Sequence, residues 1–149
     1  MALSVGSRVP AFSLPGSDGQ TWSDESLRGR RYVLTFYPKD ETPGCTAQAC
    51  AFRDAWSGFE KLGVLVFGVS RDSLESHRSF VGNQKLPYVL LSDGKAALHK
   101  ALDVGKSLFG GANRVSYLVD EQGLIRAVYE SNILFGAHSE KMLEAAQAL

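Results

Sequence analysis

Residues 31–56, RYVLTFYPKDETPGCTAQACAFRDAW, constrain the fold most strongly, because they specify a strand, a turn and a helix in succession. Residues 32–37 are β-branched and aromatic, which predicts a strand covered on both faces. Pro38 ends this strand. Thr42 followed by Pro43 is typical of a helix N-cap and a first helical residue. Apolar residues then recur every three or four positions, so one face of the helix is expected to be buried. The helix is expected to end near residues 62–63.

Cys45 is expected near the third helical position, where backbone N–H groups have no partner within the helix. Those groups and the positive end of the helix dipole favour a thiolate over a thiol. Cys50 is the only other cysteine. In an ideal helix, Cα atoms five residues apart are separated by about 8–9 Å, beyond the limit of about 7 Å for a disulfide. The two thiols can therefore join only if the first turns unwind, which suggests a catalytic redox pair with two conformations.

The cysteines have two other interpretations. A buried structural cysteine is a common fate for this residue type, and Cys50 in particular could simply pack within a helix. A structural zinc site needs four ligands, and the histidines that would complete it, His77, His99 and His138, are scattered singly. We therefore predict no metal site, and we expect each histidine to be a surface or capping residue rather than a catalytic base.

Length and composition fit one soluble α/β domain covering residues 1–149. Hydrophobic residues make up 44% of the chain and charged residues 21%, as in ordinary globular proteins. Sixteen basic residues balance sixteen acidic ones, so no net charge attracts nucleic acid or an anionic membrane. The sequence has no recognisable signal peptide and no apolar run long enough to span a membrane, which predicts a cytoplasmic protein.

The rest of the chain alternates between strand and helix patterns, which predicts βαβ units and a mainly parallel sheet that ends in an antiparallel hairpin. Asp72 is expected to cap one of the helices, with Glu75 at the capping-box position. The predicted elements are a small hairpin at 12–14 and 20–22, strands at 64–69, 88–91, 115–120 and 124–130, and helices at 72–83, 95–102 and 139–149.

The pattern Pro38-x-x-x-Thr42-x-x-Cys45 resembles the active-site signature of the peroxiredoxins. The longer string FYPKDETPGCTAQACAFRD is similar to the bacterioferritin-comigratory, or Q-type, group of that family, and the likeness extends to residues 9–15 and 113–120. Gln48 departs from the pattern, because the group usually has Glu there. Gln keeps the hydrogen-bonding capacity but removes a negative charge near Cys45.

The resemblance implies a thioredoxin-like fold, with a mixed sheet and helices on both faces, and a role for five residues. Cys45 would be the peroxidatic cysteine, and Cys50 the resolving cysteine five residues later. Thr42 would hydrogen-bond to peroxide or thiolate. Arg114, at the start of a late strand, would reach the sulfur, and Pro38 would shield the pocket.

The resemblance also implies a reaction. The chain would reduce hydrogen peroxide and organic hydroperoxides through a Cys45 sulfenic acid and an intramolecular Cys45–Cys50 disulfide. Thioredoxin or a similar dithiol would reduce the disulfide, the protein would be a monomer, and no cofactor would be needed. A thioredoxin-like reductase and a non-catalytic binding protein or holdase remain as alternatives. The first normally has two residues between its cysteines rather than four, and the second is possible because fold does not fix function.

Overall fold

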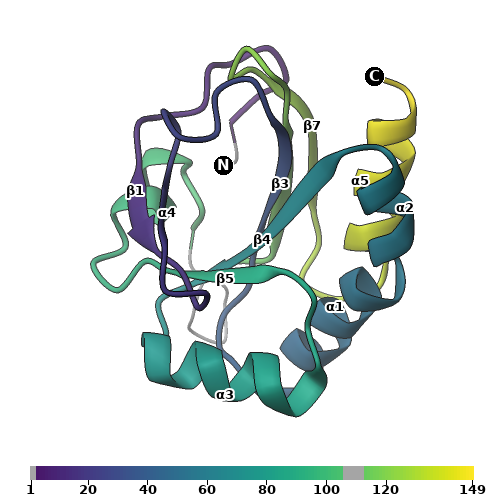
Figure 1. The fold of residues 1–149 in the computed structure, drawn as a ribbon. Coiled ribbons are helices and arrows are strands. Elements are labelled where there is room, and N and C mark those ends of the chain that lie inside the picture. Colours follow the sequence, from purple (N-terminus) through teal and green to yellow (C-terminus); the bar gives the residue numbers. More distant parts are fainter. Residues whose placement is uncertain (1–2, 106–112) are drawn as a thin grey trace.

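The computed structural model describes residues 3–105 and 113–149, and its centre is a five-stranded sheet with the order β5-β4-β3-β6-β7 (Figure 1). Strands β3, β4 and β5 are parallel, whereas β6 runs antiparallel to β3 and β7 antiparallel to β6. The predicted mixed sheet with a terminal hairpin is therefore confirmed. The strands are β3 (Arg31–Phe36), β4 (Val64–Ser70), β5 (Val89–Ser92), β6 (Val115–Val119) and β7 (Ile125–Glu130).

Five helices and a small hairpin complete the described part of the chain. The hairpin pairs β1 (Ser13–Pro15) with β2 (Thr21–Ser23) and forms a two-stranded sheet of its own. The helices are α1 (Pro43–Asp54), α2 (Trp56–Lys61), α3 (Leu74–Gln84), α4 (Ala97–Ala101) and α5 (Ala137–Gln147).

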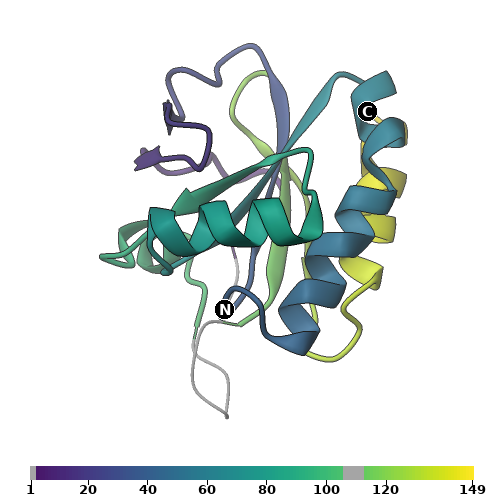
Figure 2. The same ribbon diagram turned by 60° about the horizontal axis from the view of Figure 1, so that its bottom comes forward.

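Both faces of the sheet are covered, as the residues of β3 show. Tyr32, Leu34 and Phe36 point to the face covered by the β1–β2 hairpin and α4. Val33 points to the other face, where α1, α2 and α5 pack together, on the right in Figure 1. Successive side chains of a strand point to opposite faces, so a strand buried on both sides needs an almost continuous apolar run. Helix α3 packs along the edge strand β5 and comes to the front in Figure 2.

Strand order also decides which residues meet at the carboxyl end of β3. Helix α1 follows that end directly. Because β6 is antiparallel to β3, its first residue, Val115, pairs with the last residue of β3, Phe36. The residue before Val115 is Arg114, which is thereby placed beside the start of α1. Sites of α/β proteins commonly form at the carboxyl ends of strands.

Two helix predictions need correction. The helix expected to continue to about residue 62 is interrupted at Ala55, where ψ is near 1°, and it continues as α2. The cap of α3 is Ser73, whose side chain accepts a hydrogen bond from the Ser76 N–H, and not Asp72. Asp72 Oδ2 instead accepts from the Ser70 hydroxyl and from the Asp40 N–H.

Across the described residues, we find no helix whose length and hydrophobicity would let it cross a membrane.

Candidate active site

The structure places Cys45 at the third position of α1. Thr42 has an extended backbone and Pro43 is the first helical residue, as expected. The Thr42 side chain does not cap the helix; its hydroxyl donates to the Lys39 carbonyl (2.8 Å). The first helical amide to find a carbonyl is that of Thr46, which donates to Thr42 O (2.8 Å). The N–H groups that precede Thr46 in the first turn thus have no carbonyl partner within the helix.

The Cys45 sulfur is fully buried and lies among hydrogen-bond donors. The Arg114 guanidinium donates through Nη1 to Sγ over 3.1 Å, and the Lys39 N–H lies 3.5 Å from the same sulfur. Both groups can only donate, so they match a thiolate better than a thiol, whose own proton would compete with them. The Cys45 sulfur is therefore a buried acceptor that faces two donors, one of them a cation.

Arg114 is itself buried, with 8% of its surface exposed, and three groups hold it. Besides the sulfur, its Nη1 donates to Gln48 Oε1 (3.0 Å). Its guanidinium also lies over the Phe135 ring, 4.6 Å from the centroid, within the range of a cation–π interaction. A buried guanidinium needs such partners, because an unpaired charge is costly to remove from water.

Gly44 allows this close approach. A Cβ atom at position 44 would lie 2.7 Å from Arg114 Nη2 and 2.9 Å from the Phe135 ring, both too short for real contacts. Gly44 and Phe135 were not identified as site residues from the sequence. The Thr-Pro-Gly-Cys order contains the glycine, but only the fold shows what would occupy its side-chain position.

Cys50 lies further along the same intact helix, and both cysteines are free. Five residues correspond to about 140° around a helix axis, so the two side chains point in very different directions. Cys50 is half-buried, and its thiol donates to Gln84 Oε1 at the end of α3 (3.5 Å). The prediction that the thiols do not join while the helix is intact agrees with this geometry.

Hydrogen bonds join the middle of α1 to Tyr88 and to Gln84. The Tyr88 hydroxyl, which is buried, donates to the Ala49 carbonyl (2.7 Å). Burial, and then the nearby Cys50, raise the pKa of Tyr88, so this hydroxyl stays protonated and keeps donating. Arg53 donates to the backbone carbonyl of Gln84 (2.8 Å). Unwinding the segment around Cys50 must therefore break contacts with Tyr88, just before β5, and with Gln84 at the end of α3.

Asp40 anchors the loop between β3 and α1. Its carboxylate accepts from the hydroxyls of Tyr37 (2.6 Å) and Ser76 (2.8 Å), and His77 Nδ1 lies 2.7 Å from the same group. Burial, and then the charge of Asp40, raise the pKa of Tyr37, which therefore remains a donor. Pro38, half-buried, begins this loop, so the backbone that reaches Cys45 is tied to α3.

The histidines are placed differently from the sequence expectation. His77, His99 and His138 are all buried, and none is a surface residue. Each contacts a polar partner. Asp40 is the partner of His77, and Ser116 is the partner of His138, both from distant parts of the chain. Asp93, just before α4, is the partner of His99. Buried polar side chains need such partners, and a sequence pattern does not reveal them.

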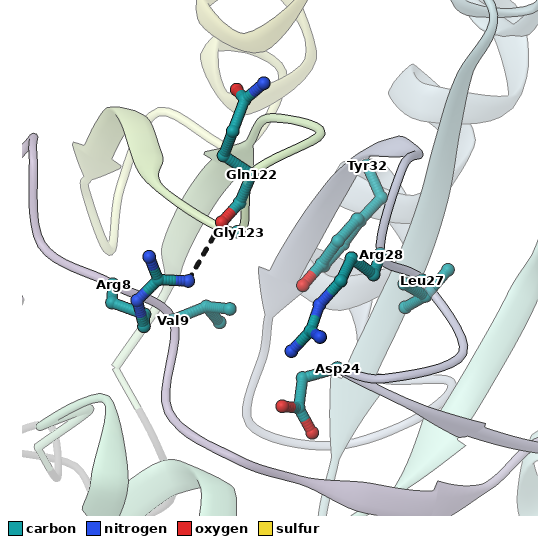
Figure 3. A pocket seen from close by; sticks show the side chains of 8 residues that line it. All are labelled: Arg8, Val9, Asp24, Leu27, Arg28, Tyr32, Gln122 and Gly123. Atoms are coloured by element: carbon teal, nitrogen blue, oxygen red, sulfur yellow. Dashed lines mark hydrogen bonds between the residues drawn. The ribbon is translucent and has the colours of Figure 1, made fainter.

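The described residues contain no group of three or more His, Cys, Asp or Glu side chains arranged to hold a metal ion. A hollow of about 50 Å³ lies near Tyr32, toward the end of β3 away from Cys45 (Figure 3). Arg8, Asp24 and Arg28 line it together with Tyr32, and neither cysteine does. Both cysteines belong to α1.

Known proteins resemble both the sequence and the fold. The model of the AhpC/TSA family matches residues 5–128. A bcp-type peroxiredoxin of Coxiella burnetii is 44% identical over 135 residues, which are 87% of this chain and 89% of the relative. The chain belongs to the peroxiredoxins. The chloroplastic peroxiredoxin Q of Suaeda salsa is 43% identical over 148 residues, 99% of this chain and 69% of that protein.

The solved structures agree with this assignment. Peroxidoxin BcpB of Mycobacterium tuberculosis superposes with a TM-score of 0.91 at 29% identity, covering 99% of this chain and 98% of that one. The thioredoxin-like peroxiredoxin fold and the Bcp/Q-type group, both inferred from the sequence, are confirmed. As a peroxiredoxin, the chain is an oxidoreductase that acts on peroxides.

The anchoring of the loop can be tested with Asp40→Ala. This change leaves the buried hydroxyl of Tyr37 and the ring nitrogen of His77 without their acceptor, so the free energy of unfolding should fall by about 2–4 kcal/mol. Ser76→Ala is the matched control, because it removes one donor and leaves Asp40 its other partners; its effect should stay below about 1 kcal/mol. Equilibrium urea unfolding measures both, and equal effects would show that Asp40 is not the anchor.

Proposed function

We propose that this peroxiredoxin is a thiol-dependent peroxidase in which Cys45 attacks the hydroperoxide and Cys50 resolves the product. The observation that supports this most strongly is the Arg114 guanidinium, 3.1 Å from a buried cysteine sulfur at the start of a helix. A cation and free amide groups around one sulfur stabilise a thiolate and any negative charge that leaves it during reaction. The whole chain, residues 1–149, forms the single domain that carries out this reaction.

Thr42 is proposed to orient the substrate. Its hydroxyl proton is committed to the Lys39 carbonyl, so the lone pairs of Oγ1 can accept the O–H of a hydroperoxide. Pro38, at the start of the same loop, would keep water away from the bound peroxide. Arg114 would donate to the peroxide oxygens as well as to the sulfur, which it can do because a guanidinium carries five N–H donors.

In the first step, the Cys45 thiolate attacks the terminal oxygen of the hydroperoxide. An S–O bond forms while the O–O bond breaks, and the leaving oxygen takes up a proton to become water or an alcohol. The sulfur is oxidised to a sulfenic acid and the peroxide is reduced. Arg114 and the amides of the first helical turn stabilise the charge that develops along the breaking bond.

In the second step, the start of α1 unwinds and the Cys50 thiolate attacks the sulfenic sulfur. A Cys45–Cys50 disulfide forms, the S–O bond breaks, and the leaving hydroxide takes up a proton to become water. The external reductant is a dithiol protein such as thioredoxin, which regenerates both thiols by exchange and is itself oxidised to a disulfide. Both cysteines belong to one chain, so the cycle needs no second subunit, and we propose a monomer acting in the cytoplasm.

Serine variants separate the two cysteine roles. Cys45→Ser should abolish peroxide consumption, because an alcohol at this position is not ionised and does not attack the O–O bond. Cys50→Ser should consume one equivalent of peroxide and then stall when thioredoxin and its reductase are the only electron source. The measurement is peroxide-dependent NADPH oxidation, with a stopped-flow trace of the first turnover. Full steady-state activity in Cys50→Ser would refute the resolving role.

The role of Arg114 can be tested with Arg114→Gln. The change removes the cation but keeps a side chain that donates, so the rate constant for the first turnover should fall by about 10²–10³-fold. Arg126→Gln is the matched control, since Arg126 pairs with Asp120, next to the turn that joins β6 and β7 and at the end of the sheet away from Cys45. That variant should stay within about twofold of the wild type. Similar losses in both variants would count against a direct role for Arg114.

A further inference from the structure

A buried chain of hydrogen bonds leads away from the Cys45 site across the sheet. Gln48, whose Oε1 accepts from Arg114 (3.0 Å), donates through Nε2 to the Thr35 hydroxyl (2.8 Å). Thr35 on β3 and Ser116 on β6 are paired residues in the sheet, and their hydroxyl oxygens lie 2.7 Å apart. Each of these side chains is almost completely buried.

The chain continues to His138 in the first turn of α5. Ser116 Oγ lies 2.8 Å from His138 Nδ1, and His138 Nε2 lies 2.9 Å from the Ser131 carbonyl. His138 is fully buried. Side chains from α1, β3, β6 and α5 thus join the guanidinium beside the sulfur to a histidine that has no part in the proposed chemistry.

The two ends of this chain fix the direction of its hydrogen bonds. At one end, Arg114 can only donate, so Gln48 must present its carbonyl oxygen to Arg114 and its amide to Thr35. The Phe36 carbonyl, 3.3 Å from Gln48 Nε2, requires the same orientation. At the other end, the Ser131 carbonyl can only accept, so His138 Nε2 carries a hydrogen.

A neutral imidazole completes the pattern. With the hydrogen on Nε2, Nδ1 of His138 accepts from the Ser116 hydroxyl. Ser116 in turn accepts from Thr35, and Thr35 accepts from Gln48. Each hydroxyl then donates once and accepts once, and every group in the chain is satisfied.

We propose that His138 is a positioning residue for Arg114: while its imidazole is neutral, the chain through Ser116 and Thr35 keeps the Gln48 carbonyl turned toward the guanidinium. Protonation of Nδ1 reverses the chain. Ser116 would then accept from His138 and donate to Thr35. The Thr35 oxygen can accept from Ser116 and from the Gln48 amide at once, so the conflict is that the Thr35 hydrogen is left without an acceptor among these side chains. Rotating the amide relieves this conflict only by turning an N–H toward Arg114.

The surroundings of His138 favour the neutral form. Burial lowers the pKa of His138, and the charge of Arg114 lowers it further, although the hydrogen bond to the Ser131 carbonyl acts in the opposite direction. From β7, the Tyr129 ring packs edge-on against the imidazole, with centroids 4.9 Å apart. A histidine whose pKa in the folded state lies below the unfolded value is neutral at pH 7 and destabilises the fold as the pH falls.

Gln48→Glu tests the direction of the chain. A carboxylate can only accept, so it would take the Thr35 hydrogen, reverse every link and favour a protonated His138. The pKa of His138, measured by NMR titration of the imidazole, should therefore rise above the wild-type value. A negative charge also acts directly through space, so the measurement is repeated with Thr35→Val, which keeps the shape of residue 35 and removes its hydroxyl.

If the chain transmits the effect, most of the rise caused by Gln48→Glu should disappear in the Thr35→Val background. A rise of equal size in both backgrounds, or no rise in either, would overturn the proposal. Ser116→Ala interrupts the chain at a second point and should give the same result as Thr35→Val, so a defect peculiar to one variant does not decide the outcome.

The consequence for activity rests on the proposed role of Cys45, whereas the NMR titration does not. In the wild type, the rate constant for the first turnover should fall by about three- to tenfold as His138 becomes protonated, because one hydrogen bond to Arg114 is lost. This fall should be absent in Thr35→Val. If the titrations show coupling but no variant reacts with peroxide, the proposed function is wrong and the hydrogen-bond chain is supported. If the rate constant falls equally in Thr35→Val, the positioning role of His138 is wrong.

Discussion

A single guanidinium nitrogen, Nη1 of Arg114, lies between the sulfur of Cys45 and the side-chain carbonyl of Gln48, and the site depends on this contact. A cation in a buried place must be compensated nearby, because transfer out of water removes its hydration. The Phe135 ring and the Gln48 carbonyl compensate part of the charge, and neither is an anion. In the reaction we propose, a thiolate at Cys45 supplies the negative charge. The contact that compensates the buried Arg114 would then also be the contact that the first step uses.

This requirement conflicts with the second half of the proposed cycle. The intact α1 holds Cys45 next to Arg114, yet it directs Cys50 to another side of the helix. Contacts from Tyr88 and Gln84 hold the segment around Cys50 in the helix. These contacts are individually modest, on the order of 1 kcal/mol each. In the proposed cycle, these contacts would hold α1 folded for the first step and break in the second. The stability of one helical turn would then set the lifetime of the sulfenic acid before Cys50 attacks it.

Much of the fold and the position of Cys45 could be predicted from local sequence. The apolar run of β3 and the Thr42-Pro43 start of α1 depend only on neighbouring residues, and both were located correctly. Arg114 is different, because 69 positions separate it from Cys45. Its place follows from the antiparallel pairing of β6 with β3. The local sequence around Arg114 indicates no role for it, and only the family resemblance identified it as a site residue.

Two errors, in the cap of α3 and in the placement of the histidines, have the same origin. Asp72 satisfied the local pattern of a helix cap, but a loop amide from another part of the chain competes for its carboxylate, and Ser73 caps α3 instead. The histidines were expected at the surface because each stands alone in the sequence. In the structure, each ring is buried against a partner that the fold supplies, such as Ser116 for His138. Local patterns predict elements, whereas polar partnerships depend on the register between strands.

The most direct test of the two-conformation account is to treat the reduced protein with one equivalent of hydrogen peroxide and to examine the product. Mass spectrometry of the digested protein should find a disulfide between Cys45 and Cys50 within one chain. Hydrogen exchange of the oxidised protein should show that the first turns of α1 have lost the protection they have in the reduced form. A disulfide between two chains, or an oxidised Cys45 beside a free Cys50 in an intact helix, would contradict the account.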